Sequence, residues 1–524
     1  MFNNVTKVAI GIIGIGYEGY RGFISLLVIK EALRKEGVEI ACVIVIEPDF
    51  NAREDCRKIS KALLFPVKLF SSLDEFFYLG TKEKFLKDFL KECDCIIFYD
   101  ASPTKYHVAN LEKTLGEDLE KELGIRAYYL GEKPISTDKS YLNSWLEDPL
   151  KKFWCNFTEI QNSAYIALKK YLNETNFEIS SLKFWRTSAI GLQKLINPEQ
   201  RAGITGGALE DKGIHDIALT IDLLGGIGNI KKEKEEITKN NKTSVMVTCP
   251  EIKPVAEQVY FMPANLYALF RSTPLFINTR GEKTINEILK MEPTEDKKEQ
   301  YWYFAADSEF KMEITWTLEE GRQVKARYYF SWAGLPEEVK DEIEKEISIK
   351  LPEDWHWLGK KEESVPISIP IIGGIRYILT EVRLMVVEGV NTKDHKNEKV
   401  ICNLLRKPSL GIKNLWIYRI IQGENKGKPI DIKETEFQFS ENFLARMFYN
   451  VILTSLNKNR FDDQVGKEPT CWAHMIVGEA REKAFKQMLG VAKLEEIESD
   501  PSKKLLIKQL SDKSIKKYEE IFLI

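Results

Sequence analysis

The sequence has no long apolar run. Its longest, such as residues 8–15 and 40–46, fall far short of the roughly 20 residues that a membrane-spanning helix needs. Residues 1–7 also lack the basic-then-apolar order of a signal peptide. We therefore expect a cytoplasmic protein with no membrane partner.

An excess of charge is missing too. The chain carries 76 basic and 79 acidic residues, for a formal net charge of −3, so no bulk attraction to nucleic acid is expected. Of the eight cysteines, only Cys93 and Cys95 lie close together, and no second pair completes a zinc site. We expect free, reduced thiols and no metal centre.

What is present is a chain too long for one core, because 524 residues usually divide into two or three domains. Up to about residue 150, short apolar runs alternate with amphipathic stretches, which is typical of a parallel sheet with crossover helices. We expect strands at 8–13, 40–46, 67–70, 95–99 and 127–130, and helices at 23–35, 52–62, 82–91 and 106–115.

The remainder, residues 151–524, has longer strands with alternating or aromatic-rich patterns, which indicates an α+β domain with a mostly antiparallel sheet. Glu320 and Gly321 favour a hairpin turn between two of these strands. Charged, helix-prone stretches at 282–300 and 336–350 are interpreted as insertions. Closing helices are expected near 443–490, and strands at 182–190, 244–249, 301–305, 310–318, 324–332, 415–421 and 435–439.

The strongest local signal is a Gly-x-Gly-x-x-Gly turn that follows the first strand and precedes a helix. Gly14 permits the tight turn, Gly16 removes a side chain where a pyrophosphate approaches the backbone, and Gly19 lets the helix pack on the strand. A purely structural loop is the alternative. The pattern predicts an α/β Rossmann domain over residues 1–150 that binds a dinucleotide.

Glu47 stands at the end of the second strand, where a dinucleotide site has an acid for the ribose hydroxyls. A carboxylate at this position repels the 2′-phosphate of NADP, so NAD is the favoured cofactor and NADP the less favoured one. The alternative is that Glu47 only caps the strand and faces water.

Further motifs follow the fourth and fifth strands, at the strand ends where open α/β sheets bind ligands. They are Ser-Pro-Thr-Lys-Tyr-His at 102–107 and Glu-Lys-Pro at 132–134, followed later by Gly-Gly-Ala-Leu-Glu-Asp-Lys-Gly-Ile-His at 206–215. Together with the glycine turn, their order and spacing resemble the glucose-fructose oxidoreductase / inositol dehydrogenase (Gfo/Idh/MocA) family. The match covers residues 7–226, and residues 443–484 resemble the closing helices of that family.

The resemblance implies a set of site residues. Lys133, Asp211 and His215 are implied as catalytic residues, with His215 as the base, Lys133 as the cation beside the developing oxyanion, and Asp211 positioning the substrate or tuning the imidazole. The roles of His215 and Lys133 could be exchanged. The implied cofactor-binding residues are Gly14, Gly16, Gly19, Glu47, Ser102, Pro103, His107, Glu132 and Lys133.

The chain also departs from the family pattern. Three residues after the histidine the family often has an acid, whereas this chain has Ala218, with Asp216 and Asp222 elsewhere. This departure weakens any inference about contacts to substrate hydroxyls.

The expected function is an NAD(P)-dependent oxidoreductase that transfers hydride between a nicotinamide cofactor and a sugar, cyclitol or related hydroxy/keto compound. Two alternatives stay open: a redox-neutral sugar-processing enzyme that retains NAD, and a non-catalytic dinucleotide sensor on the same scaffold. We also expect a homodimer or homotetramer through the second domain, because one face of its sheet needs a cover. Its substrate is expected to be a small molecule.

Overall fold

The computed structural model describes residues 5–63, 66–82, 90–116, 124–187, 207–231, 233–239, 242–248, 250–255, 260–261, 307–331, 337–347, 366–368, 376–378, 382–404, 417–422, 428–430, 442–458 and 465–490. The expected strands at 301–305 and 435–439 and the insertion at 282–300 lie outside these residues.

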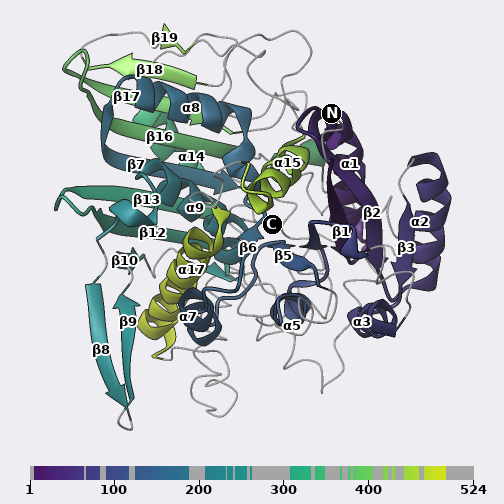
Figure 1. The fold of residues 1–524 in the computed structure, drawn as a ribbon. Helices are drawn as coiled ribbons and strands as arrows, with labels where there is room; N and C mark the ends of the chain where they lie inside the picture. The colour runs from purple at the N-terminus through teal and green to yellow at the C-terminus, as the bar shows by residue number, and fades with distance from the viewer. Residues whose placement is uncertain are drawn as a thin grey trace. The chain divides into compact units, whose positions relative to one another are not determined.

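The first sheet has six strands in the order β3-β2-β1-β4-β5-β6 (Figure 1). All of its strand pairs are parallel. Its central strands are apolar and almost fully buried, as expected for a sheet covered on both faces. The prediction of an α/β N-terminal part is confirmed. The strands are β1 (Thr6–Ile13), β2 (Val38–Ile46), β3 (Val67–Phe70), β4 (Cys95–Asp100), β5 (Arg126–Gly131) and β6 (Phe153–Cys155).

Helices follow the strands of this sheet in the order that crossover connections require. They are α1 (Tyr17–Lys35), α2 (Phe50–Leu63), α3 (Leu73–Lys82), α5 (His107–Thr114) and α7 (Lys139–Glu147). A later helix, α15 (Phe443–Ser455), packs against α1 although more than 400 residues separate them, and the Phe448 ring meets the Tyr99 ring edge-on with centroids 5.0 Å apart. One of the expected closing helices, α15, therefore packs beside the first sheet.

The second sheet has nine strands, and the prediction that it is mostly antiparallel is confirmed. One pair, β13 with β7, is parallel. The expected turn lies between β12 and β13, where Gly321 has a φ of +85°, a conformation that favours glycine. The strands are β7 (Phe177–Thr187), β10 (Glu251–Pro254), β11 (Tyr260–Phe261), β12 (Asp307–Thr317), β13 (Gln323–Ser331), β16 (Val382–Asn391), β17 (Lys396–Asn403), β18 (Ile417–Ile421) and β19 (Lys428–Pro429).

The chain has further helices and two small hairpins. The helices are α8 (Ser163–Glu174), the π-helical turn η5 (Leu209–Gly213), α9 (Ile214–Leu223), α14 (Glu337–Ile347) and α17 (Lys467–Leu489). The hairpins are β8 (Glu233–Lys239) with β9 (Lys242–Thr248), and β14 (Pro366–Ser368) with β15 (Arg376–Ile378).

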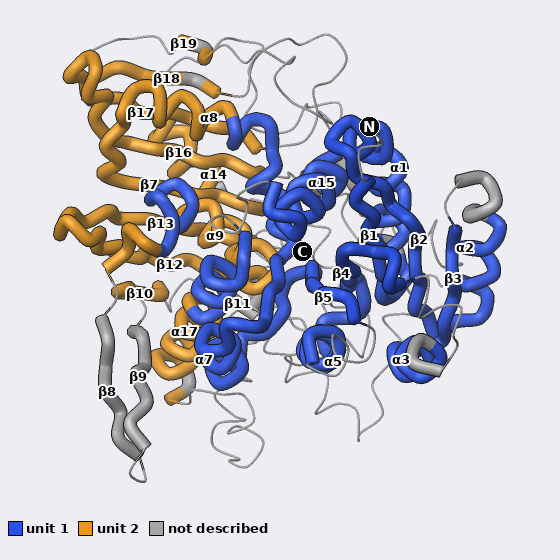
Figure 2. Tube along the Cα trace, in the orientation of Figure 1, with its two compact units in different colours: residues 1–166, 221–227, 433–475 blue, residues 167–220, 228–432, 476–524 orange. Residues whose placement is uncertain are grey.

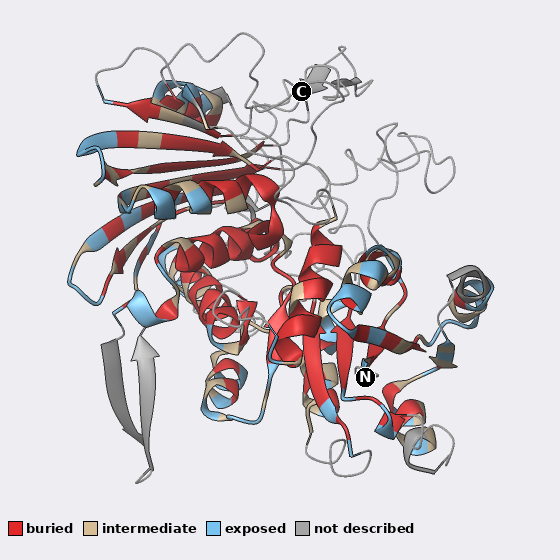
Figure 3. Cartoon of the chain, turned by 45° about the horizontal axis from the view of Figure 1, so that its top comes forward, coloured by how far each residue is buried: buried red, intermediate tan, exposed pale blue. Residues whose placement is uncertain are grey.

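The chain divides into two compact units, which Figure 2 colours separately. Unit 1 comprises residues 1–166, 221–227 and 433–475, and unit 2 comprises residues 167–220, 228–432 and 476–524. The predicted boundary near residue 150 stays a prediction. Each unit has buried strands and helix faces of its own (Figure 3). Among the described residues, none of the helices is long and apolar enough to cross a membrane.

Candidate functional site

The strand order of the first sheet reverses direction between β1 and β4. From β1 the chain moves outward to β2 and β3, and β4 then returns to the other side of β1. Ligands of open α/β sheets bind at the carboxyl ends of the strands at such a switch point. The glycine turn follows β1 and the segment that begins at Ala101 follows β4, so both motifs flank this point.

The three glycines of the turn meet different surroundings. Gly14 has a φ of +79°, and a Cβ there would lie 2.9 Å from the Ser102 backbone. A Cβ on Gly19 would lie 2.0 Å from the Gly14 carbonyl oxygen, so this glycine permits the close approach of α1 to the turn. A Cβ on Gly16 would have no heavy atom within 4 Å other than those of its neighbours in the chain. Gly16 thus faces open space at the beginning of α1.

Glu47 holds the glycine turn through its carboxylate. The Ile15 backbone N–H donates to Glu47 Oε2 at 2.7 Å, and the Asp49 N–H donates to Oε1 at 2.9 Å. The alternative that Glu47 only caps its strand and faces water does not describe this geometry, because the carboxylate ties the end of β2 to the turn after β1. Contact with a ribose stays a prediction.

Arg53 lies beside the same strand end. Its guanidinium donates to the Glu47 carbonyl oxygen and, at 2.8 Å, to the Pro48 carbonyl oxygen. The Arg53 guanidinium carbon also lies 5.8 Å from the centre of the Phe50 ring. A cation is therefore fixed next to the acid that the sequence singled out.

A buried carboxylate organises the turn after β4. Asp100 is fully buried and accepts hydrogen bonds from the Ser102 N–H at 2.9 Å, from Asn110 Nδ2 at 2.9 Å and from the Tyr129 hydroxyl at 2.8 Å. Burial and then the charge of Asp100 raise the pKa of Tyr129, which keeps that hydroxyl protonated as a donor. The Ser102-Pro103 backbone is therefore rigidly placed.

His107 connects this turn to the turn after β5. Its Nδ1 lies 2.8 Å from the Pro134 carbonyl oxygen, and its Nε2 lies 2.8 Å from the Ser102 carbonyl oxygen. The ring is 1% exposed. Both ring nitrogens thus face protein carbonyls, so His107 holds these two turns together, and its role in binding a cofactor stays a prediction.

The turn after β5 carries Glu132 and Lys133. Glu132 Oε1 accepts hydrogen bonds from the Tyr99 hydroxyl and from Asn156 Nδ2, both at 2.5 Å. Burial, followed by the charge of Glu18, raises the pKa of Glu132, and the two hydrogen bonds and Lys133 oppose this rise. Glu132 thus anchors the turn, while Lys133 is partly exposed.

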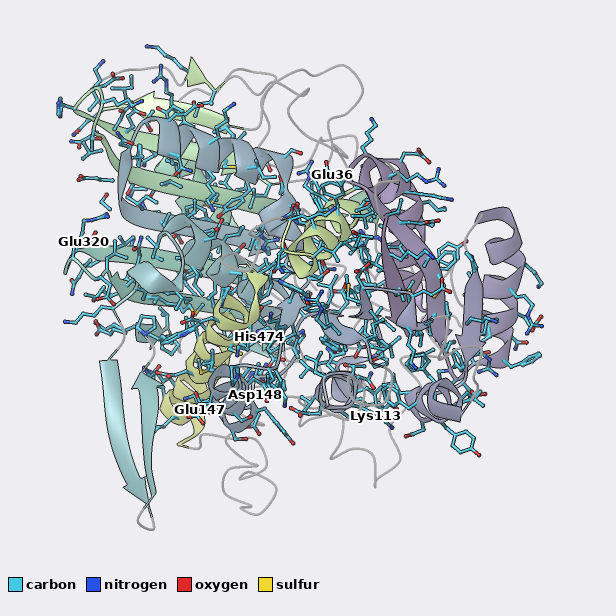
Figure 4. All side chains as sticks on the ribbon, in the orientation of Figure 1. Glu36, Lys113, Glu147, Asp148, Glu320 and His474 are labelled. Atoms are coloured by element: carbon cyan, nitrogen blue, oxygen red, sulfur yellow. The ribbon has the colours of Figure 1, made fainter. Side chains whose placement is uncertain are left out.

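His474 is a residue of this site that the sequence did not reveal. It lies on α17 (Figure 4), is fully buried, and accepts the Ile135 backbone N–H at Nε2 over 2.9 Å. Its Nδ1 lies 2.7 Å from the Thr470 carbonyl oxygen, so Nδ1 is the protonated nitrogen of a neutral ring. Burial lowers the pKa of His474 to about 4. Two histidines from different helices therefore fix the turn of Lys133.

The pKa of His474 predicts a loss of stability in acid. Between pH 6.5 and 4 the unfolded imidazole binds a proton that the folded one does not, so the free energy of unfolding falls as the pH falls, by about 2 kcal/mol at pH 5. Urea unfolding at pH 7 and pH 5 measures this change. In His474→Gln the amide can still accept from Ile135 and donate to Thr470, so this variant should lose less stability between the two pH values. If the parent protein and His474→Gln lost the same stability between pH 7 and pH 5, the attribution of this loss to His474 would be contradicted.

The remaining catalytic candidates belong to unit 2. Asp211 lies in the π-helical turn η5 and His215 in the first turn of α9, and both side chains are buried, with exposed fractions of 4% and 8%. Asp211 forms an ion pair with Lys212 at 3.4 Å, and its neighbour Glu210 pairs with Arg481. The structure has a π-helical turn directly before the regular helix α9, a feature that is frequent at functional sites.

The two other acids of this helix have structural partners. Asp216 accepts hydrogen bonds from Arg186 Nε at 2.9 Å and from its Nη2 at 2.5 Å, and both side chains are buried. Within unit 1, Asp222 accepts the Tyr165 hydroxyl at 2.6 Å. Asp216 and Asp222 therefore do not replace the acid that the family often has at the position of Ala218. Lys133 belongs to unit 1 and Asp211 and His215 to unit 2, so their presence in one substrate site stays a prediction.

Comparisons with known proteins give fold neighbours. No family model matches the sequence, and no curated protein matches it. A scyllo-inositol dehydrogenase from Lactobacillus casei, solved with NAD(H) and scyllo-inositol, is 12% identical with a TM-score of 0.45, over 92% of this chain and 98% of that one. A putative myo-inositol dehydrogenase from Sinorhizobium meliloti 1021 is 12% identical with a TM-score of 0.46, over the same shares.

A third solved structure is the UDP-N-acetylglucosamine 3-dehydrogenase GnnA from Acidithiobacillus ferrooxidans. It is 11% identical with a TM-score of 0.44, over 90% of this chain and 96% of that one. These three neighbours are named as dehydrogenases. At this level of similarity they do not assign an activity to the chain.

Proposed function

We propose that the chain is an NAD(P)-dependent oxidoreductase that transfers hydride between a nicotinamide cofactor and a sugar, cyclitol or related hydroxy/keto compound. The observation that carries this proposal is the glycine turn at the switch point of the parallel sheet, with Gly16 facing open space and Glu47 bonded to the Ile15 N–H. At Gly16 neither a positive φ nor a steric contact requires glycine, so the fold of the turn does not by itself account for this residue.

The described residues fit a dinucleotide. The beginning of α1 offers backbone N–H groups and the positive end of the helix dipole to a pyrophosphate, and the bare Gly16 lets it approach. The Glu47 carboxylate has lone pairs left for a ribose hydroxyl beside the Ile15 N–H. When bound, the nicotinamide ring supplies the hydride acceptor or donor.

Lys133 and His215 are proposed for the chemistry at the carbon-oxygen bond. Oxidation of an alcohol requires a base for the hydroxyl proton and a cation or donor for the developing oxyanion. The turn that carries Lys133 is fixed by Glu132, His107 and His474, which suits a side chain that must hold one position. His215 is the proposed base, and Asp211, one turn earlier, positions the substrate or tunes the imidazole.

The proposal is tested by the small molecules that remain bound after gentle purification and by hydride exchange. We expect NAD or NADP to be retained or to bind on titration, and single-turnover reduction with at least one member of a panel of polyols and keto-sugars. Tight NAD binding without exchange for any member would favour a sensor. Turnover without added cofactor, by protein that already carries nicotinamide absorbance, would favour a redox-neutral enzyme.

We predict that NAD(H) binds at least several-fold more tightly than NADP(H), because Glu47 stands where a 2′-phosphate would lie. Fluorescence titration of both cofactors measures the ratio, and Glu47→Gln should narrow it by removing the negative charge while keeping one acceptor for Ile15. Equal or reversed affinities in the parent protein would contradict this role of Glu47. They would point instead to Arg53 as the ligand of the phosphate.

A further inference from the structure

The second sheet has two faces, and different helices lie on them. Glu398 and Lys399 are neighbours on β17, so their side chains point to opposite faces. Tyr171 of α8 donates to Glu398 at 2.5 Å, whereas Glu346 of α14 pairs with Lys399 at 2.5 Å. Therefore α8 and α14 lie on opposite faces of the sheet. We call the face under α14 the outer face.

One half of the outer face is apolar, and α14 lies over it. The helix presents Val339, Ile343 and Ile347, which are spaced four residues apart and are 5% exposed or less. They form one buried cluster with side chains from five strands: Trp185, Tyr329, Val382, Leu384, Val386, Ile401 and Ile420. Without α14 this half would present two large aromatic and several aliphatic side chains to water.

The acidic side chains of α14 pair with lysines of the sheet beneath it. The helix has six acidic and two basic residues. Its Glu342 pairs with Lys311 of β12 at 2.8 Å, and its Glu346 pairs with Lys183 of β7 at 2.6 Å. With the Lys399 pair, the helix is bound to three strands by partly buried ion pairs.

The other half of the outer face is charged. Arg327 of β13 is 58% exposed and pairs with Glu313 of β12 at 2.9 Å. On the edge strand, Lys253 and Glu251 pair at 2.7 Å with exposed fractions of 66% and 57%. Charged side chains on an edge strand such as β10 disfavour edge-to-edge pairing with another sheet. The charged residues described on this half are therefore exposed, in contrast to the apolar half that α14 covers.

We propose that α14 is a built-in partner of the second sheet, which closes the outer face against pairing with a second copy of the chain. The helix begins six residues after β13 ends, so it belongs to the sheet of its own chain. A homodimer or homotetramer of this protein then has to form through another surface. The expectation of pairing through this sheet rested on an uncovered face, and α14 covers its apolar half.

The test uses the full-length protein and two kinds of variant. Arg327→Glu alters the charged half, and light scattering should give the same molecular mass as for the parent protein. Ile343→Asp and Glu346→Lys should release α14, the first by placing a charge in the apolar cluster and the second by placing a cation between Lys183 and Lys399. Both should bind several times more of a hydrophobic dye and show a mass that rises with protein concentration.

Asp341→Asn, on the exposed side of α14, is the matched control and should behave as the parent protein. Circular dichroism separates release of the helix from global unfolding, and Glu346→Lys is the informative variant where Ile343→Asp unfolds. A change of mass in Arg327→Glu would overturn the proposal. So would a folded Glu346→Lys protein whose dye binding and mass equal those of the parent. None of these readouts depends on the proposed enzyme activity.

Discussion

Gly16→Val is expected to lower the affinity for NAD by at least about 100-fold, equivalent to about 2.7 kcal/mol, and to leave the stability of the fold near that of the parent protein. The valine side chain would occupy the open space at the beginning of α1, where the pyrophosphate has to approach the backbone. Because a Cβ at this position would meet no heavy atom within 4 Å beyond its neighbours in the chain, we expect the valine to require little rearrangement of the fold. Its φ of −55° is also accessible to valine.

Fluorescence titration with NADH measures the expected loss of affinity, and thermal unfolding measures the expected unchanged stability. Gly19→Ala is the contrasting variant, because its Cβ would lie 2.0 Å from the Gly14 carbonyl oxygen and should destabilise the fold itself. Gly228→Val is the matched control, an exposed glycine outside the motif that also has open space at its Cβ, and it should change neither quantity. Parent-like NADH binding by Gly16→Val would remove the glycine turn from the cofactor site.

Five of the six strands of the first sheet could be predicted because their residues carry the signal locally, whereas the three-residue strand β6 was missed because it is too short to show a pattern. A parallel strand that is buried on both faces is a continuous apolar run, and β1, β2 and β4 are such runs. The turns at Gly14 and Gly321 could be predicted for the same reason, because a positive φ at a single position favours glycine whatever the distant residues are.

The second sheet was harder, and β16 and β17 were missed. In β16 the central run Leu384–Val387 is buried without alternation and is followed by Glu388 and Gly389. Such a short apolar run does not distinguish a buried strand from a buried helix segment. The strand lies in the middle of the sheet because of its pairing with β7, about 200 residues earlier in the chain. The helix expected within 336–350 is confirmed as α14, but its position on the sheet depends on partners in distant strands.

The candidate site shows the same limit. Glu47 was identified from its place at a strand end, yet its bond to the Ile15 N–H spans 32 residues. His474 could not be identified, because its partner Ile135 lies 339 residues earlier and a single histidine in a helix is not a motif. Residues that hold a turn through the backbone of another segment leave no mark in the local sequence.

Replacing Lys133 by Met or His215 by Ala is expected to lower turnover by about 10²- to 10⁴-fold, the usual contribution of a positioned acid, base or cation. NAD should bind to both variants nearly as well as to the parent protein, because neither change touches the glycine turn or Glu47. Lys133→Met keeps the length of the side chain, and its turn stays anchored by Glu132, His107 and His474.

Single-turnover hydride transfer and NADH titration separate chemistry from binding, with Lys152→Met, an exposed lysine before β6, as the matched control. Turnover at parent-like rates in both variants would refute the catalytic assignment and support a dinucleotide sensor. Weak NADH binding by Lys133→Met would instead support the cofactor contact of Lys133 that the family resemblance also implies.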